Sequence, residues 1–340
     1  MKLPTRIITI ILLAIAAIPC LRAEESKVDY RPVISGALRA RYEYSTAEGN
    51  QRFQVRNARL IVSGNVAPAI SYFVQADLCD RGVMKIFDAW GRLRLWQTLA
   101  LQGGQFRLPF GTDCYRGPGN YIFPNPSYVG WEMNNVRGVG AKMSYTFSLP
   151  AGSLFVDGGA FNPTAITDHN VWVRTLAYAA KVQYTLGNVT LATGFQTISP
   201  DSVRINLTGA SASWNCGRWT VEGEYINKHY THRRFKTTHG YNLWANYQFP
   251  VRAGMFNRAS FQARVDGMTD HSTGARNSEG ALTANHPGRN RITAGATLTY
   301  LSTPVRCDLR VSYEKFFYRR SVTPAAGEND RICAELVVKF

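Results

Sequence analysis

The sequence lacks any long apolar segment. A membrane-spanning helix needs roughly 18 or more consecutive apolar residues, and no stretch of this chain reaches that length. The longest apolar run, 7–18, follows Lys2 and Arg6 and precedes Leu21-Arg22-Ala23. This order is typical of a cleavable export signal. We therefore expect residues 1–23 to be a signal peptide and residues 24–340 to be a single exported domain without a helical anchor.

Closely spaced cysteines are also missing. No two cysteines have the CxxC spacing, which argues against a zinc or redox site. An odd number of cysteines follows residue 23, namely Cys79, Cys114, Cys216, Cys307 and Cys333. At least one of them must stay free. Cys79 and Cys114 both fall in expected outer loops and could form a disulfide, which the sequence leaves open.

Acidic residues are scarce relative to basic ones. The chain has 39 Lys and Arg against 23 Asp and Glu, a net charge of +16. Residues 1–23 contain three basic residues and no acid, so residues 24–340 carry 16 − 3 = +13. Such an excess attracts anions, whether nucleic acid, lipid phosphate or small solutes. The placement of the charges along the chain has to decide between these partners.

Helical periodicity is absent, and two-residue alternation takes its place almost everywhere. Near the C-terminus, Leu309, Val311 and Tyr313 alternate with Arg310 and Glu314. We count sixteen such segments, an even number, as a closed antiparallel barrel requires. Two further predictions concern the fourth and fifth of these segments. Phe87 is assigned to the apolar outer face, and Gly103-Gly104 is predicted to be a bulge where the apolar parity switches.

The connections and the aromatic residues support a transmembrane barrel. Short turns such as 187–188 and 302–304 alternate with long loops such as 162–174 and 268–289. Aromatics gather beside the short turns, among them Trp96 and Trp219, as in an interfacial girdle. The predicted fold is therefore all-β, a sixteen-stranded antiparallel transmembrane barrel of the porin type in the outer membrane of a Gram-negative bacterium.

The inward face is expected to line an aqueous lumen, because sixteen strands leave too wide a space for a packed core. Basic residues outnumber acidic ones on this face. The expected anion path consists of Arg39, Arg41, Arg59, Arg92, Arg94, Arg107, Lys142, Lys181, Arg264, Arg306 and Arg310. Positive charge inside a narrow pore concentrates anions. The alternative interpretation is that these residues pair with acids across strands and only brace the wall.

The longest connection, 109–135, is rich in aromatics and proline, which favours an ordered structure. We predict that it folds into the barrel and narrows it, with Arg116, Tyr115, Tyr121 and Trp131 at the constriction. The alternative is an outer cap.

Several stretches resemble the phosphate-selective porins O and P. These are the segment 56–64 (RNARLIVSG) and the segment 104–111 (GQFRLPFG), with weaker similarity at 161–162, 263–266 and 292–300. The resemblance covers essentially the whole mature chain and implies a trimeric channel through which anions diffuse. The loop 109–135 carries few basic residues and also Asp113 and Glu132, so the resemblance leaves phosphate selectivity open.

The expected function is passive diffusion of small hydrophilic solutes with an anion preference. A non-conducting structural or surface-interaction barrel is the alternative. An enzyme is less favoured, because all six histidines lie in or beside outer loops, and His229-x-x-His232 is a weak metal motif. Expected partners are small anionic solutes, outer-membrane lipid including lipopolysaccharide, and identical subunits in a homotrimer. No cofactor and no nucleic acid are expected.

Overall fold

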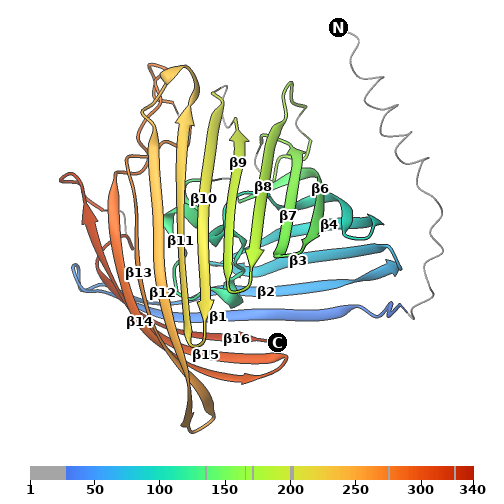
Figure 1. Ribbon diagram of the computed structural model, residues 1–340. Helices are drawn as coiled ribbons and strands as arrows, with labels where there is room; N and C mark the ends of the chain where they lie inside the picture. The colour runs from blue at the N-terminus through green and yellow to red at the C-terminus, as the bar shows by residue number, and fades with distance from the viewer. Residues whose placement is uncertain are drawn as a thin grey trace.

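The computed structural model describes residues 28–134, 136–164, 166–170, 172–199, 203–274, 276–324 and 327–340, so the expected signal peptide lies outside the described residues. The chain forms a closed antiparallel barrel in which β1 pairs with β16 (Figure 1). The strands are β1 (Val33–Ser45), β2 (Gln51–Ala67), β3 (Ile70–Asp80), β4 (Val83–Trp96), β5 (Leu99–Arg107), β6 (Arg137–Leu149), β7 (Gly152–Phe161), β8 (Ala177–Leu186), β9 (Val189–Ile198), β10 (Ile205–Cys216), β11 (Trp219–Tyr230), β12 (Thr238–Ala253), β13 (Phe256–Met268), β14 (Arg289–Ser302), β15 (Val305–Tyr318) and β16 (Arg331–Lys339). The predicted sixteen-stranded barrel is confirmed.

The two ends of the barrel differ in the length of their connections. At one end, two-residue turns join β2 to β3, β4 to β5, and so on to β14 and β15. At the other end the connections are longer, with the exception of Arg81-Gly82 between β3 and β4. We call the end with the longer connections the outer end. The longest outer connection, residues 108–136, is called the inner loop below because of where it lies.

The two faces of the sheet have opposite character. Leu243, Phe261 and Val311 on the outside are 56%, 60% and 56% exposed, whereas Arg264 and Asp308 on the inside are 3% and 0% exposed. The apolar side chains on the outside can contact lipid. Closure of the sheet also pairs the backbone hydrogen-bonding groups of every strand with a neighbouring strand, so none is left exposed to lipid. Among the described residues, no helix is long and apolar enough to cross a bilayer.

Two predicted details of β4 and β5 are wrong. The β3–β4 register shifts so that Gln75 pairs with Asp88 and Ala76 with Ile86, which leaves Phe87 as an extra residue. This bulge turns Phe87 inward, where it is 7% exposed. By contrast, the β5 register is unbroken through Gly103-Gly104.

The apolar parity switch in β5 has a different cause from the predicted bulge. Phe106 faces inward, where it joins Leu108, Phe161 and Ala177 in a buried apolar cluster. The prediction from alternation assumed that every inward-facing side chain is in contact with water. Here the inner wall is apolar because it packs against neighbouring apolar side chains.

The disulfide left open by the sequence is not formed, because all five cysteines among the described residues are free. Cys79 lies inside β3 and not in an outer loop, which corrects its predicted position. Cys114 is buried in the short helix η1 (Asp113–Tyr115), where its thiol donates to the carbonyl oxygen of Phe110 at 2.9 Å.

Candidate functional site

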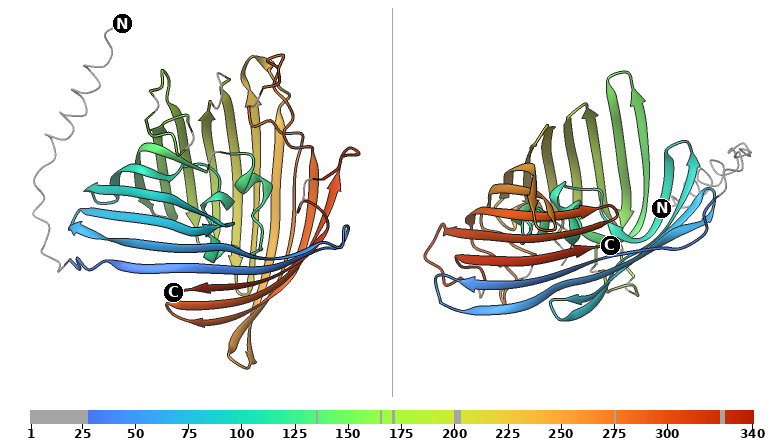
Figure 2. Two further views of the ribbon diagram at one scale, coloured as in Figure 1. Left: turned by 180° about the vertical axis from the view of Figure 1, so that it is seen from behind. Right: turned by 90° about the horizontal axis from the view of Figure 1, so that it is seen from below.

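The inner loop crosses the interior of the barrel and touches its wall on several sides (Figure 2). It contains η1, the one-turn helix η2 (Pro118–Asn120) and the short helix α2 (Tyr128–Trp131). Helix η2 lies beside β1 and β16, and α2 lies beside β11, β12 and β13. The loop therefore reaches strands far from β5 and β6, the two that it connects.

Arginines from three strands hold consecutive backbone carbonyls of the inner loop. Arg41 of β1 donates to the carbonyl oxygen of Pro124 at 2.8 Å, as Arg39 does at 2.5 Å. Arg264 of β13 binds the carbonyl oxygen of Asn125 at 2.8 Å. Arg291 of β14 binds that of Pro126 at 2.7 Å. Hydrogen bonds from charged donors are stronger than neutral ones, so this contact fixes the middle of the loop against one wall.

The same arginines form ion pairs with buried carboxylates. Glu335 of β16 lies 2.7 Å from Arg39 and 2.9 Å from Arg41. Glu314 and Asp266 serve Arg264 and Arg291 in the same way, at 2.8–3.6 Å. Unpaired charges buried to this degree would cost several kcal/mol each. We call β1 and β13–β16, with their paired charges, the loop-bearing wall.

The first part of the inner loop is fixed by β8 and β11. Glu224 accepts hydrogen bonds from the backbone N–H groups of Thr112 and Asp113 at 2.7 and 2.9 Å. Lys181 donates to the carbonyl oxygen of Gly111 at 2.7 Å. Arg116 pairs with Asp113 at 2.6 Å and also with Glu222.

Asp113 is the charged centre of this part of the loop. Burial alone would raise the pKa of Asp113. The guanidinium of Arg116 and the hydroxyl of Ser127, which donates at 2.6 Å, outweigh that effect and hold the pKa below its usual value of 3.8. The carboxylate is therefore ionised at neutral pH and links the start of the loop to the N-cap of α2.

Apolar packing gives the inner loop a second means of attachment. Phe110, Tyr128, Val129 and Met133 of the loop pack into a buried cluster with the inward residues of the wall, namely Ile205, Leu207, Ile226, Tyr230, Met268 and Phe316. Each fully buried side chain of this size contributes about 1.5–3 kcal/mol. The fit is tight at Gly240 of β12, where an added Cβ would lie 2.0 Å from the sulfur of Met133.

The predicted constriction residues are dispersed along the loop. Tyr115 lies beneath the ammonium of Lys181, which is 4.9 Å from its ring centroid. Tyr121 is buried beside Arg39, and the guanidinium of Arg116 lies 5.0 Å from the ring centroid of Trp244. Trp131 is the most exposed of the four, at 38%. Three of these side chains thus contact the wall.

The predicted anion path divides into two groups. Seven of its eleven residues have a carboxylate within ion-pair distance, namely Arg39, Arg41, Arg59, Lys142, Arg264, Arg306 and Arg310. Within the described part of the chain, Arg92, Arg94, Arg107 and Lys181 have none and donate to neutral oxygens instead. Most of these basic residues therefore form ion pairs within the barrel wall. The other four have no ion-pair partner within the described ranges, and we call their charges uncompensated.

Two of these uncompensated arginines lie on strands to which the described residues of the inner loop are not attached by hydrogen bonds. Among the described residues, no hydrogen bond joins the inner loop to β3 or β4, and we call these two strands the bare wall. Phe73 and Trp90 stack on its inner face with ring centroids 5.2 Å apart. Arg92 lies 5.4 Å from the Trp90 ring, and Arg94 is exposed towards the short-turn end.

Sequence reasoning missed Arg289 and Arg291 at the start of β14. Both share the inward parity of Thr293, so extending the alternation by four residues would have found them. The acceptors of Arg291 include a loop carbonyl, for which the sequence holds no signal.

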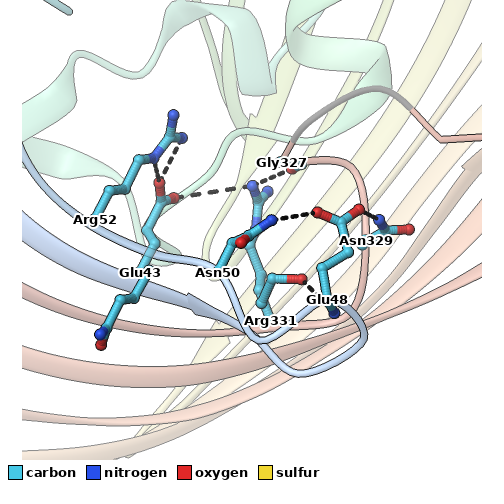
Figure 3. A pocket seen from close by; sticks show the side chains of 9 residues that line it. Glu43, Glu48, Asn50, Arg52, Gly327, Asn329 and Arg331 are labelled. Carbon is cyan, nitrogen blue, oxygen red and sulfur yellow. Dashed lines mark hydrogen bonds and ion pairs between the residues drawn. The ribbon is translucent and has the colours of Figure 1, made fainter.

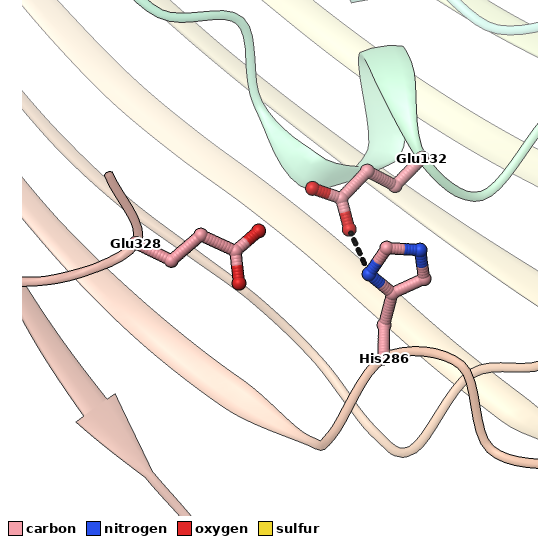
Figure 4. Close-up of side chains that lie close together, drawn as sticks. All are labelled: Glu132, His286 and Glu328. Atoms are coloured by element: carbon pink, nitrogen blue, oxygen red, sulfur yellow. Dashed lines mark ion pairs between the residues drawn. The ribbon is translucent and has the colours of Figure 1, made fainter. Parts of the chain in front are cut away.

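Two further clusters of polar residues lie at the outer end. A pocket of about 140 Å³ at the ends of β1, β2 and β16 is lined by Glu43, Glu48, Arg52 and Arg331 (Figure 3). Glu43 pairs with Arg52 and Arg331, and Glu48 accepts hydrogen bonds from the amides of Asn50 and Asn329. Helix α2 is followed by its C-cap residue Glu132, which lies beside His286 and Glu328 (Figure 4).

The second cluster is held by an arginine. The carboxylates of Glu132 and Glu328 each lie 2.9 Å from Arg289. A bound arginine competes with a metal ion for these oxygens, so the arrangement serves to attach the end of the inner loop to β14. His229 and His232 do not form part of any metal-binding group found among the described residues.

These features define a class of protein. A closed sixteen-stranded barrel with an apolar exterior, a charged interior and a loop folded within it has the architecture of the porins of the Gram-negative outer membrane, and the outer membrane is the location of this protein. Residues 125–256, less than half of the chain, match the sequence model of the family described as Gram-negative porin. A search of curated protein sequences finds no match.

Solved structures share the fold at low sequence identity. The anion-selective porin from Comamonas acidovorans has a TM-score of 0.63 and 14% identity, covering 91% of this chain and 99% of that one. OmpF of Salmonella typhi, in complex with daunomycin, has a TM-score of 0.61 and 13% identity over 91% and 97%. The outer membrane channel DcaP of Acinetobacter baumannii has 0.57 and 12% over 91% and 97%. At these identities the likeness establishes the fold alone.

Proposed function

We propose that this protein is an outer-membrane porin for passive diffusion of small hydrophilic solutes, and that the inner loop is its constriction. The support is the position of the loop. It crosses the lumen and is attached by arginine–carbonyl contacts to the loop-bearing wall and by Glu224 and Lys181 to β11 and β8. Solutes would pass between this loop and the bare wall.

The preference for anions is also our proposal, and it rests on a smaller set of charges than the sequence offered. Paired arginines add less field to a pore than unpaired ones, because a neighbouring carboxylate offsets part of their charge at a distance. Arg92, Arg94, Arg107 and Lys181 have no such partner among the described residues and carry the preference.

A planar-bilayer measurement in a KCl gradient tests the proposal. We expect open-channel conductance and a reversal potential on the chloride side. A reversal potential on the potassium side would refute the anion preference but leave the porin function standing. We expect inorganic phosphate to block little of the chloride current; strong block at micromolar phosphate would instead indicate a phosphate-selective pore.

The second candidate function is a non-conducting structural or surface-interaction barrel. The extensive burial of paired charges inside the barrel favours it. This candidate predicts correctly inserted protein with no conductance in the same bilayer experiment. We propose no catalytic role for either case.

We further propose that the barrel assembles as a homotrimer in contact with lipopolysaccharide. The support is the fold, since the similar structure of Vibrio cholerae OmpT is described as a trimer form. The molar mass of the protein in detergent, measured by light scattering, tests the trimer.

A further inference from the structure

A cavity of about 420 Å³ lies at the outer end of the barrel, beyond α2. Residues from the inner loop and from several other outer segments line it, among them Glu132, Asp168, Lys228 and His271. Cavities of this size accommodate small organic molecules. Met133, Pro163 and Ile198 give part of the lining an apolar character.

Lys228 is the most unusual residue of this lining. It is 2% exposed, and within the described residues no carboxylate lies within ion-pair distance of its amine. The amine instead faces two neutral groups, the ring Nε2 of His271 at 2.7 Å and the carbonyl oxygen of Ser272 at 3.1 Å. A protonated lysine has three N–H donors, so one has no nitrogen or oxygen acceptor among the described residues, although the ring centroid of Tyr230 lies 5.6 Å from the amine.

His271 offers a second donor. Because Lys228 donates to Nε2, the neutral ring carries its proton on Nδ1. Burial, reinforced by the charge of Lys228, lowers the pKa of His271 to about 2, which keeps the ring neutral. The ring is fully buried, and Nδ1 has no hydrogen-bond partner. Buried donors of this kind are costly unless an acceptor reaches them.

The acidic residues of the lining do not neutralise the positive charge of Lys228. Glu132 is bound by Arg289 at 2.9 Å and lies 3.6 Å from His286. Asp168 is exposed at the edge of the cavity. The lining therefore brings together the buried N–H donors of Lys228 and His271 and the apolar carbon of Met133 and Ile198.

From this geometry we infer that the cavity is a binding site for a small organic oxyanion, a carboxylate or a phosphate ester with an apolar body. Lys228 and His271 would bind the oxyanion group, and Met133 and Ile198 would contact the body. The inference deepens the proposed anion-preferring porin function by naming a class of solute held at the outer entrance.

Calorimetric titration of the intact protein in detergent tests the site independently of conduction. The probes are benzoate and phenyl phosphate, with neutral benzyl alcohol and inorganic phosphate as controls for the body and the head group. We expect both organic anions to bind about tenfold more tightly than either control, as for a charged hydrogen bond in a buried site. The relative affinity of the two anions decides between carboxylate and phosphate.

Three variants locate the binding. Lys228→Met is expected to weaken the binding of both organic anions about tenfold and to leave the affinity for benzyl alcohol unchanged. Lys315→Met, at an exposed lysine outside the cavity, is expected to change none of these affinities. Ile198→Trp keeps the amine and fills the cavity with a larger side chain, so it is expected to abolish binding of anions and alcohol alike. Circular dichroism and heat-dependent gel mobility confirm that each variant is folded.

Failure takes two forms. Equal affinity of the organic anions for the wild type and Lys228→Met, or no binding by the wild type, would overturn the inference. Neither result touches the porin proposal, which the reversal potential decides separately.

Discussion

The loop-bearing wall and the bare wall are built from the same residue types but use them differently. On the loop-bearing wall, Arg39, Arg41, Arg264 and Arg291 are buried, paired with carboxylates and bonded to carbonyls of the inner loop. On the bare wall, Arg92 lies beside stacked aromatics and the side chain of Arg94 is bonded only to the carbonyl oxygen of Pro68 among the described residues. Whether a carboxylate and a loop reach an arginine thus decides whether it braces the barrel or is left, in our proposal, to interact with solutes.

The largest effect is expected from removing the charge of Glu335 on the loop-bearing wall. Glu335→Gln leaves Arg39, Arg41 and Arg310 with one fewer buried negative charge, and we expect the free energy of unfolding to fall by about 3–5 kcal/mol. Urea titration in detergent measures it. The exposed Glu279 provides the control, since Glu279→Gln should alter stability little. Similar losses for the two variants would contradict the paired network.

A smaller loss is expected where the inner loop packs on β12. In Gly240→Ala the new methyl collides with Met133, and we expect destabilisation of about 1–3 kcal/mol together with faster proteolysis within residues 108–136. Gly223→Ala is the matched control, because there the nearest atom lies at an ordinary 3.6 Å. An inner loop equally protected in both variants would mean that α2 is not held by this contact.

On the bare wall the expected change is in selectivity rather than stability. Arg92→Gln/Arg94→Gln removes two uncompensated charges, and we expect the anion-to-cation permeability ratio to fall about two- to threefold. Arg306→Gln removes a charge that Asp308, which also pairs with Arg310, partly offsets at 2.9 Å, so its effect should be smaller. Reversal potentials in KCl gradients compare them. If Arg306→Gln proved the stronger, the division into two groups would be wrong.

The smallest effect concerns pH. Since the pKa of Asp113 lies below its usual 3.8, its carboxylate stabilises the fold fully above that value, and the contribution is lost only as pH falls through the lower, folded pKa. We therefore expect the difference in unfolding free energy between the wild type and Asp113→Asn to be constant from about pH 8 to 5 and to shrink below about pH 4. A difference that already declines between about pH 7 and 5 would contradict the ion pair with Arg116.

Much of the barrel could be predicted from particular residues. Alternation in segments such as Leu309–Glu314 assigned inward and outward faces correctly, because a strand's side chains point to opposite faces in turn. The same rule failed at Phe87, where a bulge adds one residue, and at Phe106, where the inward side is apolar. Both failures lie where the interior is packed rather than filled with solvent.

The predicted residues of the solute path were found by parity alone, and parity carries no information about partners. It placed Arg39 and Arg92 in one group, although Arg39 is bonded to the carbonyl oxygen of Pro124 in the inner loop and Arg92 instead lies beside the ring of Trp90. Arg291 escaped notice because the strand begins earlier than its apolar pattern. Lys228 and His271 are 43 residues apart in the sequence and meet only because β11 and the β13–β14 connection end at the same rim.

The sequence by itself determined the closed barrel, its apolar exterior and its basic interior, because these follow from a local two-residue period and the need to satisfy backbone hydrogen bonds in lipid. Only the tertiary structure decided which basic residues remain uncompensated. That outcome depends on the path of the inner loop and on contacts between distant strands, and a Coulomb interaction depends on distance in space rather than along the chain.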